Sequence, residues 1–94
     1  MLDKNGSIMQ ALVKVAEVYG IDYIEKHKNA PCCYSEHEDG TINISFLFES
    51  DEDRPELSAD YLGWTVYATV KVDPTTAEAH LIDGIMPNGK RVYP

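Results

Sequence analysis

Hydrophobic side chains follow a helical period at the start of the chain. Apolar residues recur there at steps of three and four, namely Ile8, Ala11, Leu12, Val15, Val18 and Tyr19. Polar residues lie between them, so the spacing predicts an amphipathic helix with one apolar stripe toward a core. We expect Ser7 to cap the N-terminus, with Gln10 reaching back in a capping box, and Gly20 to end the helix.

The period changes after a second, shorter helical segment. Asp22 is placed to cap a short helix or an irregular extension over residues 22–28. Pro31 closes the helical part because a proline biases the residue before it away from helical angles. From residue 32 onward, apolar and polar positions alternate, which is the period of a β-strand with one buried face.

Four segments with strand character predict an antiparallel sheet: residues 32–37, 41–49, 64–73 and 77–83. Gly40 supplies one turn between them, and Asp73 with Pro74 supplies another. The expected core face of these strands holds Ile42, Ile44, Phe46, Phe48, Trp64, Val66, Ala68, Val70, Val72, Ala77, Ala79 and Leu81. Residues 84–94 are expected to form a small terminal hairpin or a tail.

One amphipathic helix and about four strands, each apolar on one side, are satisfied when the helix packs across the apolar face of the sheet. The sequence therefore predicts a two-layer α+β fold, with residues 1–94 as one domain. This layout resembles that of cystatin-like and PepSY-like domains, and residues 67–74 are similar to a hairpin that many of them carry. The resemblance implies a shape and no function.

The whole net charge of −8 lies between Glu36 and Asp60. Nine carboxylates and one basic residue, Arg54, fall in this stretch, whereas the charges on either side of it cancel. Such a field attracts cations and basic surfaces and repels nucleic-acid phosphates. Because eight basic residues against sixteen acidic ones offer no basic stripe, we expect no direct binding of nucleic acid.

The acidic segment at residues 50–56 does not have the spacing of a calcium loop. An EF-hand needs a glycine at its sixth position and a bidentate glutamate at its twelfth, and Pro55 interrupts the segment instead. No nucleophile elbow, phosphate loop or metalloprotease motif occurs elsewhere. We therefore expect no enzyme activity, no metal site and no cofactor.

Cys32 and Cys33 are adjacent in the sequence, which bears on their chemistry. Together with His27 and His37 they lack the spacing of a zinc site, and nearby carboxylates disfavour a reactive thiolate. On a strand, one of the two is expected to be buried and the other exposed. Neighbouring cysteines cannot cross-link distant elements, and no signal peptide or membrane span is evident, so we expect a cytoplasmic protein.

The leading hypothesis is a small non-enzymatic interaction module, immunity- or inhibitor-like, that binds a basic protein through the loop at residues 49–60. Its candidate partner-binding residues are Glu49, Asp51, Glu52, Asp53, Glu56, Asp60 and Tyr67. Tyr67 is included because an outward-facing tyrosine supplies contact area with a polar tip.

Two alternatives belong to other classes of function. The first is a small-molecule pocket between helix and sheet, lined by Tyr19, Tyr23, Tyr34, Phe46 and Trp64. The second is a homodimer formed through the outer sheet face, which requires exposed apolar side chains there. The residues that would supply them are Ile24, Leu47 and Ile82.

Overall fold

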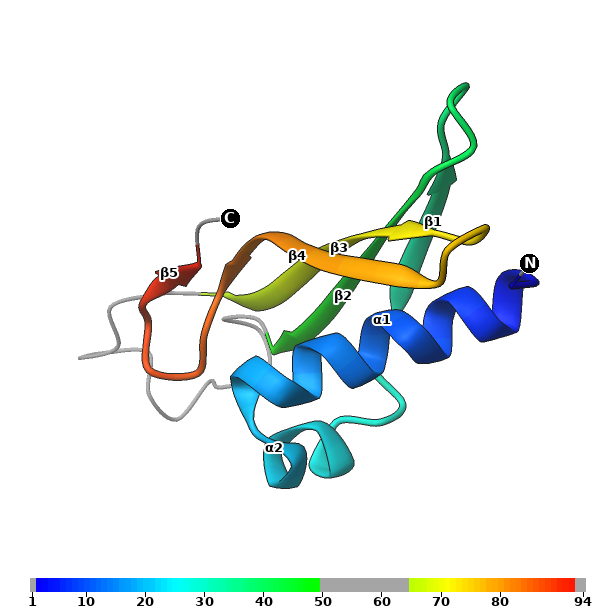
Figure 1. Cartoon of the computed structure of the whole chain (residues 1–94). Coiled ribbons are helices and arrows are strands. Elements are labelled where there is room, and N and C mark those ends of the chain that lie inside the picture. The colour runs from blue at the N-terminus through cyan, green and yellow to red at the C-terminus, as the bar shows by residue number, and fades with distance from the viewer. Residues whose placement is uncertain (1, 50–64, 93–94) are drawn as a thin grey trace.

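The computed structural model of the chain describes residues 2–49 and 65–92. Its elements are α1 (Lys4–Tyr19), α2 (Ile21–Lys26), β1 (Cys32–Glu36), β2 (Ile42–Glu49), β3 (Val66–Asp73), β4 (Glu78–Ile85) and β5 (Arg91–Val92). Helix α1 lies along one face of an antiparallel sheet in the order β1-β2-β3-β4-β5 (Figure 1). The predicted two-layer α+β fold is confirmed. The sheet has five strands rather than about four because residues 91–92 pair with β4 and complete a terminal hairpin.

Helix α1 begins one turn earlier than predicted. The side chain of Asp3 accepts a hydrogen bond of 2.7 Å from the amide of Gly6, which satisfies a donor of the first turn. Ser7 lies inside the helix, fully buried, and its hydroxyl has no partner among the described residues. The predicted Ser7 cap is therefore wrong, because Asp3 has the same capping chemistry and the helix continues through Gly6.

The C-terminal end of α1 is where the sequence places it. Gly20 has a φ of 97°, a left-handed conformation that a glycine adopts without strain, and its amide bonds the carbonyl of Ala16 at 3.0 Å. Helix α2 follows directly at Ile21. Asp22 lies in its first turn and is not the N-cap, a position that Gly20 occupies without a side-chain bond.

The core lies between α1 and the two central strands. Cross-strand partners on this face are Ile42 with Val72, Ile44 with Val70, and Phe46 with Ala68. All six are buried, together with Ala11, Val15 and Tyr19 of the helix. The face predicted from alternation is confirmed for β2 and for β3 from Val66 onward, whereas Trp64 lies outside the described residues.

A β-bulge shifts the pattern of β4. Val70 pairs with Leu81, but the preceding Thr69 pairs with Asp83, so Ile82 is an extra residue on β4. The core-facing positions therefore pass from Leu81 to Gly84, and the simple alternation expected over residues 77–83 does not continue.

The turn between β3 and β4 is longer than predicted. The amide of Ala77 bonds the carbonyl of Asp73 at 2.8 Å, and Ala77 has a φ of 63°. Ala77 therefore belongs to the turn, and its predicted place on the core face of a strand is wrong. The strand begins at Glu78.

Strand β1 lies at the edge of the sheet, outside the area that α1 covers. The helix packs mainly on β3 and β4 and touches β2 less. Cys32 and Cys33 are both exposed free thiols, so the expectation that one of them is buried is wrong. The physical reason is that neither face of this edge strand is covered at that point. Within residues 2–49 and 65–92, neither helix has the length and hydrophobicity needed to cross a bilayer.

Candidate functional site

Most of the predicted partner-binding residues cannot be placed by the structure. Asp51, Glu52, Asp53, Glu56 and Asp60 lie outside the described residues. Glu49 ends β2, opposite Val66, the first residue of β3. Residues 50–65, which include the acidic segment, thus connect the ends of two neighbouring strands.

Tyr67, the remaining predicted residue, lies on the outer face of β3. It is half-buried, and its hydroxyl donates a hydrogen bond of 3.1 Å to Oδ2 of Asp83 on β4. Burial and the Asp83 carboxylate raise the pKa of Tyr67 above its ordinary value. Beside it lie Leu47, which is 42% exposed, and a hydrogen-bonded pair of hydroxyls from Ser45 and Thr69. The outer face of the sheet thus presents both polar and apolar side chains around Tyr67.

A homodimer through the outer sheet face depends on three exposed apolar residues, and one of the three is not exposed. Ile24 of α2 is buried in the core, so it does not meet the condition on which this alternative depends. Ile82, the bulge residue, is half-buried. Leu47 alone of the three is exposed.

Of the aromatic residues expected to line a pocket between helix and sheet, Tyr19, Tyr23 and Phe46 pack around Phe48 instead, and Trp64 lies outside the described residues. Tyr19 and Phe46 are buried in the core, and Tyr23 and Tyr34 pack against it. The ring of Phe48 lies 6.1 Å from that of Tyr19 and 5.9 Å from that of Tyr23, centroid to centroid. These rings fill the end of the layer where α1 meets α2.

Tyr19 also makes a partly buried hydrogen bond that should respond to pH. Its hydroxyl donates to the carbonyl of Tyr67 at 2.7 Å. Burial, followed by the nearby Tyr67 and Asp83, raises the pKa of Tyr19 well above its ordinary value of 10.0. The folded chain therefore holds a proton that the unfolded chain releases near pH 10, and the folded state loses stability as the pH rises above that value.

We expect the free energy of unfolding to fall by about 1 kcal/mol between pH 9 and pH 11 through this residue. Urea unfolding at the two pH values measures the change. A Tyr19→Phe variant should show a smaller decrease because it has no proton to release there. Equal decreases in the variant and the parent would contradict this assignment.

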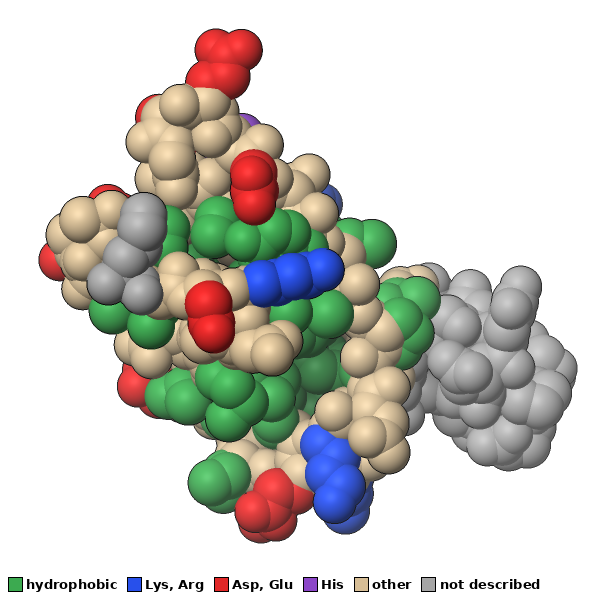
Figure 2. Space-filling view, turned by 90° about the vertical axis from the view of Figure 1, so that its right-hand side faces the viewer, with side chains coloured by type: hydrophobic (Ala, Val, Ile, Leu, Met, Phe, Trp, Pro, Cys, Tyr) green, Lys and Arg blue, Asp and Glu red, His purple; other side chains and the backbone are tan. Residues whose placement is uncertain are grey.

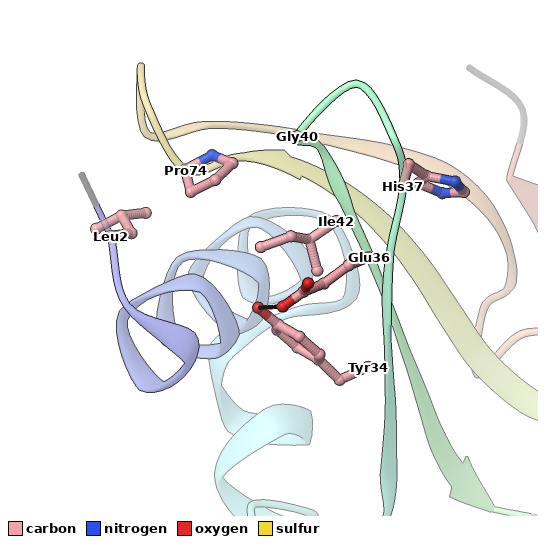
Figure 3. A pocket seen from close by; sticks show the side chains of 7 residues that line it. All are labelled: Leu2, Tyr34, Glu36, His37, Gly40, Ile42 and Pro74. Atoms are coloured by element: carbon pink, nitrogen blue, oxygen red, sulfur yellow. Dashed lines mark hydrogen bonds between the residues drawn. The ribbon is translucent and has the colours of Figure 1, made fainter.

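A different pocket lies at the opposite end of the inner sheet face. Its volume is about 230 Å³, and its lining residues are Leu2, Tyr34, Glu36, His37, Gly40, Ile42 and Pro74. Tyr34 and Glu36 reach from β1 toward Leu2, while the His37 ring points away from them (Figure 3). The amide of Leu2 bonds the carbonyl of Pro74 at 2.8 Å, which holds the chain N-terminus against the β3–β4 turn.

The chemistry of this pocket combines an apolar wall with a carboxylate. Leu2, Ile42 and Pro74 form the wall, and the hydroxyl of Tyr34 donates to Oε1 of Glu36 at 3.4 Å. Loss of hydration and the negative Glu36 raise the pKa of Tyr34, so it remains neutral. Such a site suits a long aliphatic side chain that ends in a cation, because the stem and the charge find matching surroundings.

More negative charge lies at the tip of the β1–β2 hairpin. Glu38 and Asp39 are exposed there. Asp39 accepts hydrogen bonds from the hydroxyl and the amide of Thr41, at 2.6 and 2.9 Å, and these bonds lower the pKa of its carboxyl. The apolar centre of this end of the molecule thus has acidic side chains around it (Figure 2). No group of three metal-ligating side chains forms anywhere in the described part of the chain.

The pocket was not among the sites predicted from the sequence. Tyr34 and Glu36 are two residues apart on a strand, so alternation places them on one face. The sequence therefore indicates that the two side chains share a face of the strand, but it does not show whether another element covers that face. Comparisons with protein-family models, with curated proteins and with solved structures found no match to this chain.

Proposed function

We propose that this chain is a small non-enzymatic binding module, immunity- or inhibitor-like, whose partner is a basic protein. The observation that carries the proposal is the confinement of the net charge of −8 to residues 36–60. A localised field of this kind accelerates encounter with an oppositely charged surface and orients it.

The exposed charges support this proposal. Outside the acidic stretch, some acidic residues pair with basic ones, as Lys14 does with Glu17 at 3.5 Å and Arg91 with Asp83 at 3.8 Å. Glu36, Glu38 and Asp39 form no ion pair with any other described residue. Their charge remains available to a partner.

The proposed contact residues are the acidic positions Glu49, Asp51, Glu52, Asp53, Glu56 and Asp60, with Tyr67. Tyr67 is the second residue of β3. It lies near the end of the sheet where β2 ends and β3 begins, and the chain between these two strands contains the acidic segment. We place the protein in the cytoplasm, a proposal supported by the two exposed free cysteines, which suit a reducing compartment.

The test uses a triple variant, Asp51→Asn, Glu52→Gln and Asp53→Asn, in which three of these carboxylates become neutral amides. The tagged parent chain should capture a basic protein from its source cells at low salt. The amount of that protein recovered with the triple variant should be about tenfold lower. The basic protein should also be released from the parent chain by high salt, because the attraction is screened.

The matched control removes three exposed carboxylates elsewhere, through Glu17→Gln, Glu25→Gln and Glu78→Gln. The net charge of both triple variants is the same, so the control should retain the partner within about twofold if position matters. Equal retention by the parent and both variants would sink the proposal.

A further inference from the structure

We propose that the free edge of β1 binds an extended segment of the basic partner by strand addition, with one lysine or arginine of that segment in the pocket beside Tyr34 and Glu36. This inference rests on the proposed function and names the part of the partner that is recognised. Strand addition combines main-chain hydrogen bonds with pockets for alternate side chains.

The hydrogen-bond pattern of β1 shows which backbone groups are free. The amide of His37 bonds Thr41, and the amide of Leu47 bonds Pro31, at the two ends of the β1–β2 ladder. Because bonded pairs alternate in an antiparallel ladder, the residues that bond β2 between these ends are Cys33 and Ser35. The backbone groups of Cys32, Tyr34 and Glu36 therefore point to the outer edge, where no other described residue bonds them.

Apart from the charged Glu36 on its inner face, this edge lacks the features that commonly protect an edge strand. Such features include lysine or proline within the strand, a bulge, or a very short strand. Strand β1 has five residues, without lysine, proline or a shift in register against β2. The opposite edge consists of β5, which pairs only with Gly84 and Ile85, and of residues 78–83 of β4, where the bulge at Ile82 interrupts the regular ladder. The edge with a regular ladder is thus on the side of the pocket.

The pocket lies where side chains of an added strand would project. Every second side chain of that strand would lie on the inner face, next to Tyr34 and Glu36. Helix α1 packs mainly on β3 and β4, and its first residue, Lys4, lies over the Tyr34 ring. A lysine or arginine there would lay its stem against Leu2 and Ile42 and bring its charge to Glu36.

Charge complementarity identifies the occupant. The carboxylates around the edge are Glu36, Glu38 and Asp39, and the ammonium group of Lys4 lies 5.2 Å from the centre of the Tyr34 ring. Lys4 therefore shows that a cation is accommodated against this ring. A second copy of the chain would bring the same net charge of −8 to the edge, so a basic segment fits better.

The probe for the test is a nine-residue peptide of alternating arginine and valine with blocked ends. At low salt we expect it to bind the parent chain and to slow hydrogen exchange of the Tyr34 and Glu36 amides by about tenfold or more. A matched probe carries methyl groups on alternate backbone nitrogens, which keeps its charge and removes donors. This probe should bind at least about tenfold more weakly.

Two variants of the chain test the site itself. Glu36→Gln should weaken binding of the alternating peptide by about tenfold, whereas Glu78→Gln, with the same change in net charge, should alter it by less than about twofold. Tyr34→Pro removes an outward-facing amide without removing a bond to β2, and it should abolish the protection of Glu36.

The outcomes separate this inference from the proposed function. Equal binding of the methylated and parent peptides would overturn strand addition, as would equal effects of Glu36→Gln and Glu78→Gln. Either result leaves capture of the basic protein intact if the acidic segment alone mediates it. A mass of two chains in solution that falls to one in Tyr34→Pro would also overturn the inference, because the edge would then hold a second copy.

Discussion

Replacing Gly84 with alanine is expected to lower the free energy of unfolding by about 3 kcal/mol. Gly84 pairs with Ala68 and lies directly beneath the side chain of Tyr19. An added Cβ would overlap the hydroxyl oxygen of Tyr19 and lie 2.7 Å from the carbonyl oxygen of Tyr67. These two oxygens form the partly buried hydrogen bond between helix and sheet, so the substitution disturbs packing and hydrogen bonding at once. Urea unfolding of variant and parent measures the loss.

A double-mutant cycle with Tyr19→Phe separates the two contributions. Removing the hydroxyl relieves its overlap with the new methyl group, so Gly84→Ala should cost less in the Tyr19→Phe background. Part of the cost should remain because the carbonyl of Tyr67 belongs to the backbone of β3 and cannot move aside. A midpoint of unfolding that Gly84→Ala leaves unchanged would contradict the close approach of helix and sheet.

Ile44→Ala should remove about 3 to 4 kcal/mol of stability. Ile44 is 0% exposed and lies in the middle of β2, between Tyr34 and Val70 on the neighbouring strands. Shortening it leaves a cavity under α1 that the surrounding strands cannot close. A domain of this size is stable by roughly 5 to 10 kcal/mol, so the change removes a large part of the total and should be evident in urea or thermal unfolding.

The matched control is Ile21→Ala, the same chemical change at an exposed position. Ile21 opens α2 and is 65% exposed. Its truncation should change the free energy of unfolding by no more than about 0.5 kcal/mol. If the two variants were equally stable, the assignment of Ile44 to the centre of the core would be wrong.

The parts of the fold that could be predicted from the sequence are those governed by local rules. Alternation identifies the core face of β2 from Ile42 to Phe48 and of β3 from Val66 to Val72, because both strands are covered on one side only. Gly20 marks the end of α1 since no other residue there adopts a left-handed conformation without strain. Both predictions depend on a few neighbouring residues, and both are confirmed.

The errors arise where the outcome depends on tertiary contacts. Asp3 and Ser7 both have capping side chains, and only the packing of α1 shows that Ser7 is buried inside the helix. The bulge at Ile82 depends on how β4 pairs with β3, and alternation within β4 alone cannot show it. The place of Gly84 beneath Tyr19 follows from that bulge and was therefore not foreseeable.

One part of the candidate site could also be predicted from local sequence, and another part depends on tertiary contacts. The concentration of charge between Glu36 and Asp60 is evident in the sequence, and a basic partner follows from it as a hypothesis. The pocket at Tyr34 was missed because its existence depends on where α1 stops covering the sheet. Cys32 and Cys33 were assigned incorrectly for the same reason, since alternation predicts two faces but not whether either of them is covered.

The unequal edges of the sheet limit the assemblies that this protein can form through its strands. A filament built by edge-to-edge pairing needs two open edges on each subunit, so that every copy can be extended in both directions. Here β1 offers five residues in regular register, whereas the opposite edge consists of the two residues of β5 and the bulged part of β4 that β5 does not reach. An added strand or chain would thus pair with β1, and the irregular opposite edge would oppose further growth, which favours a complex of fixed size over a fibre.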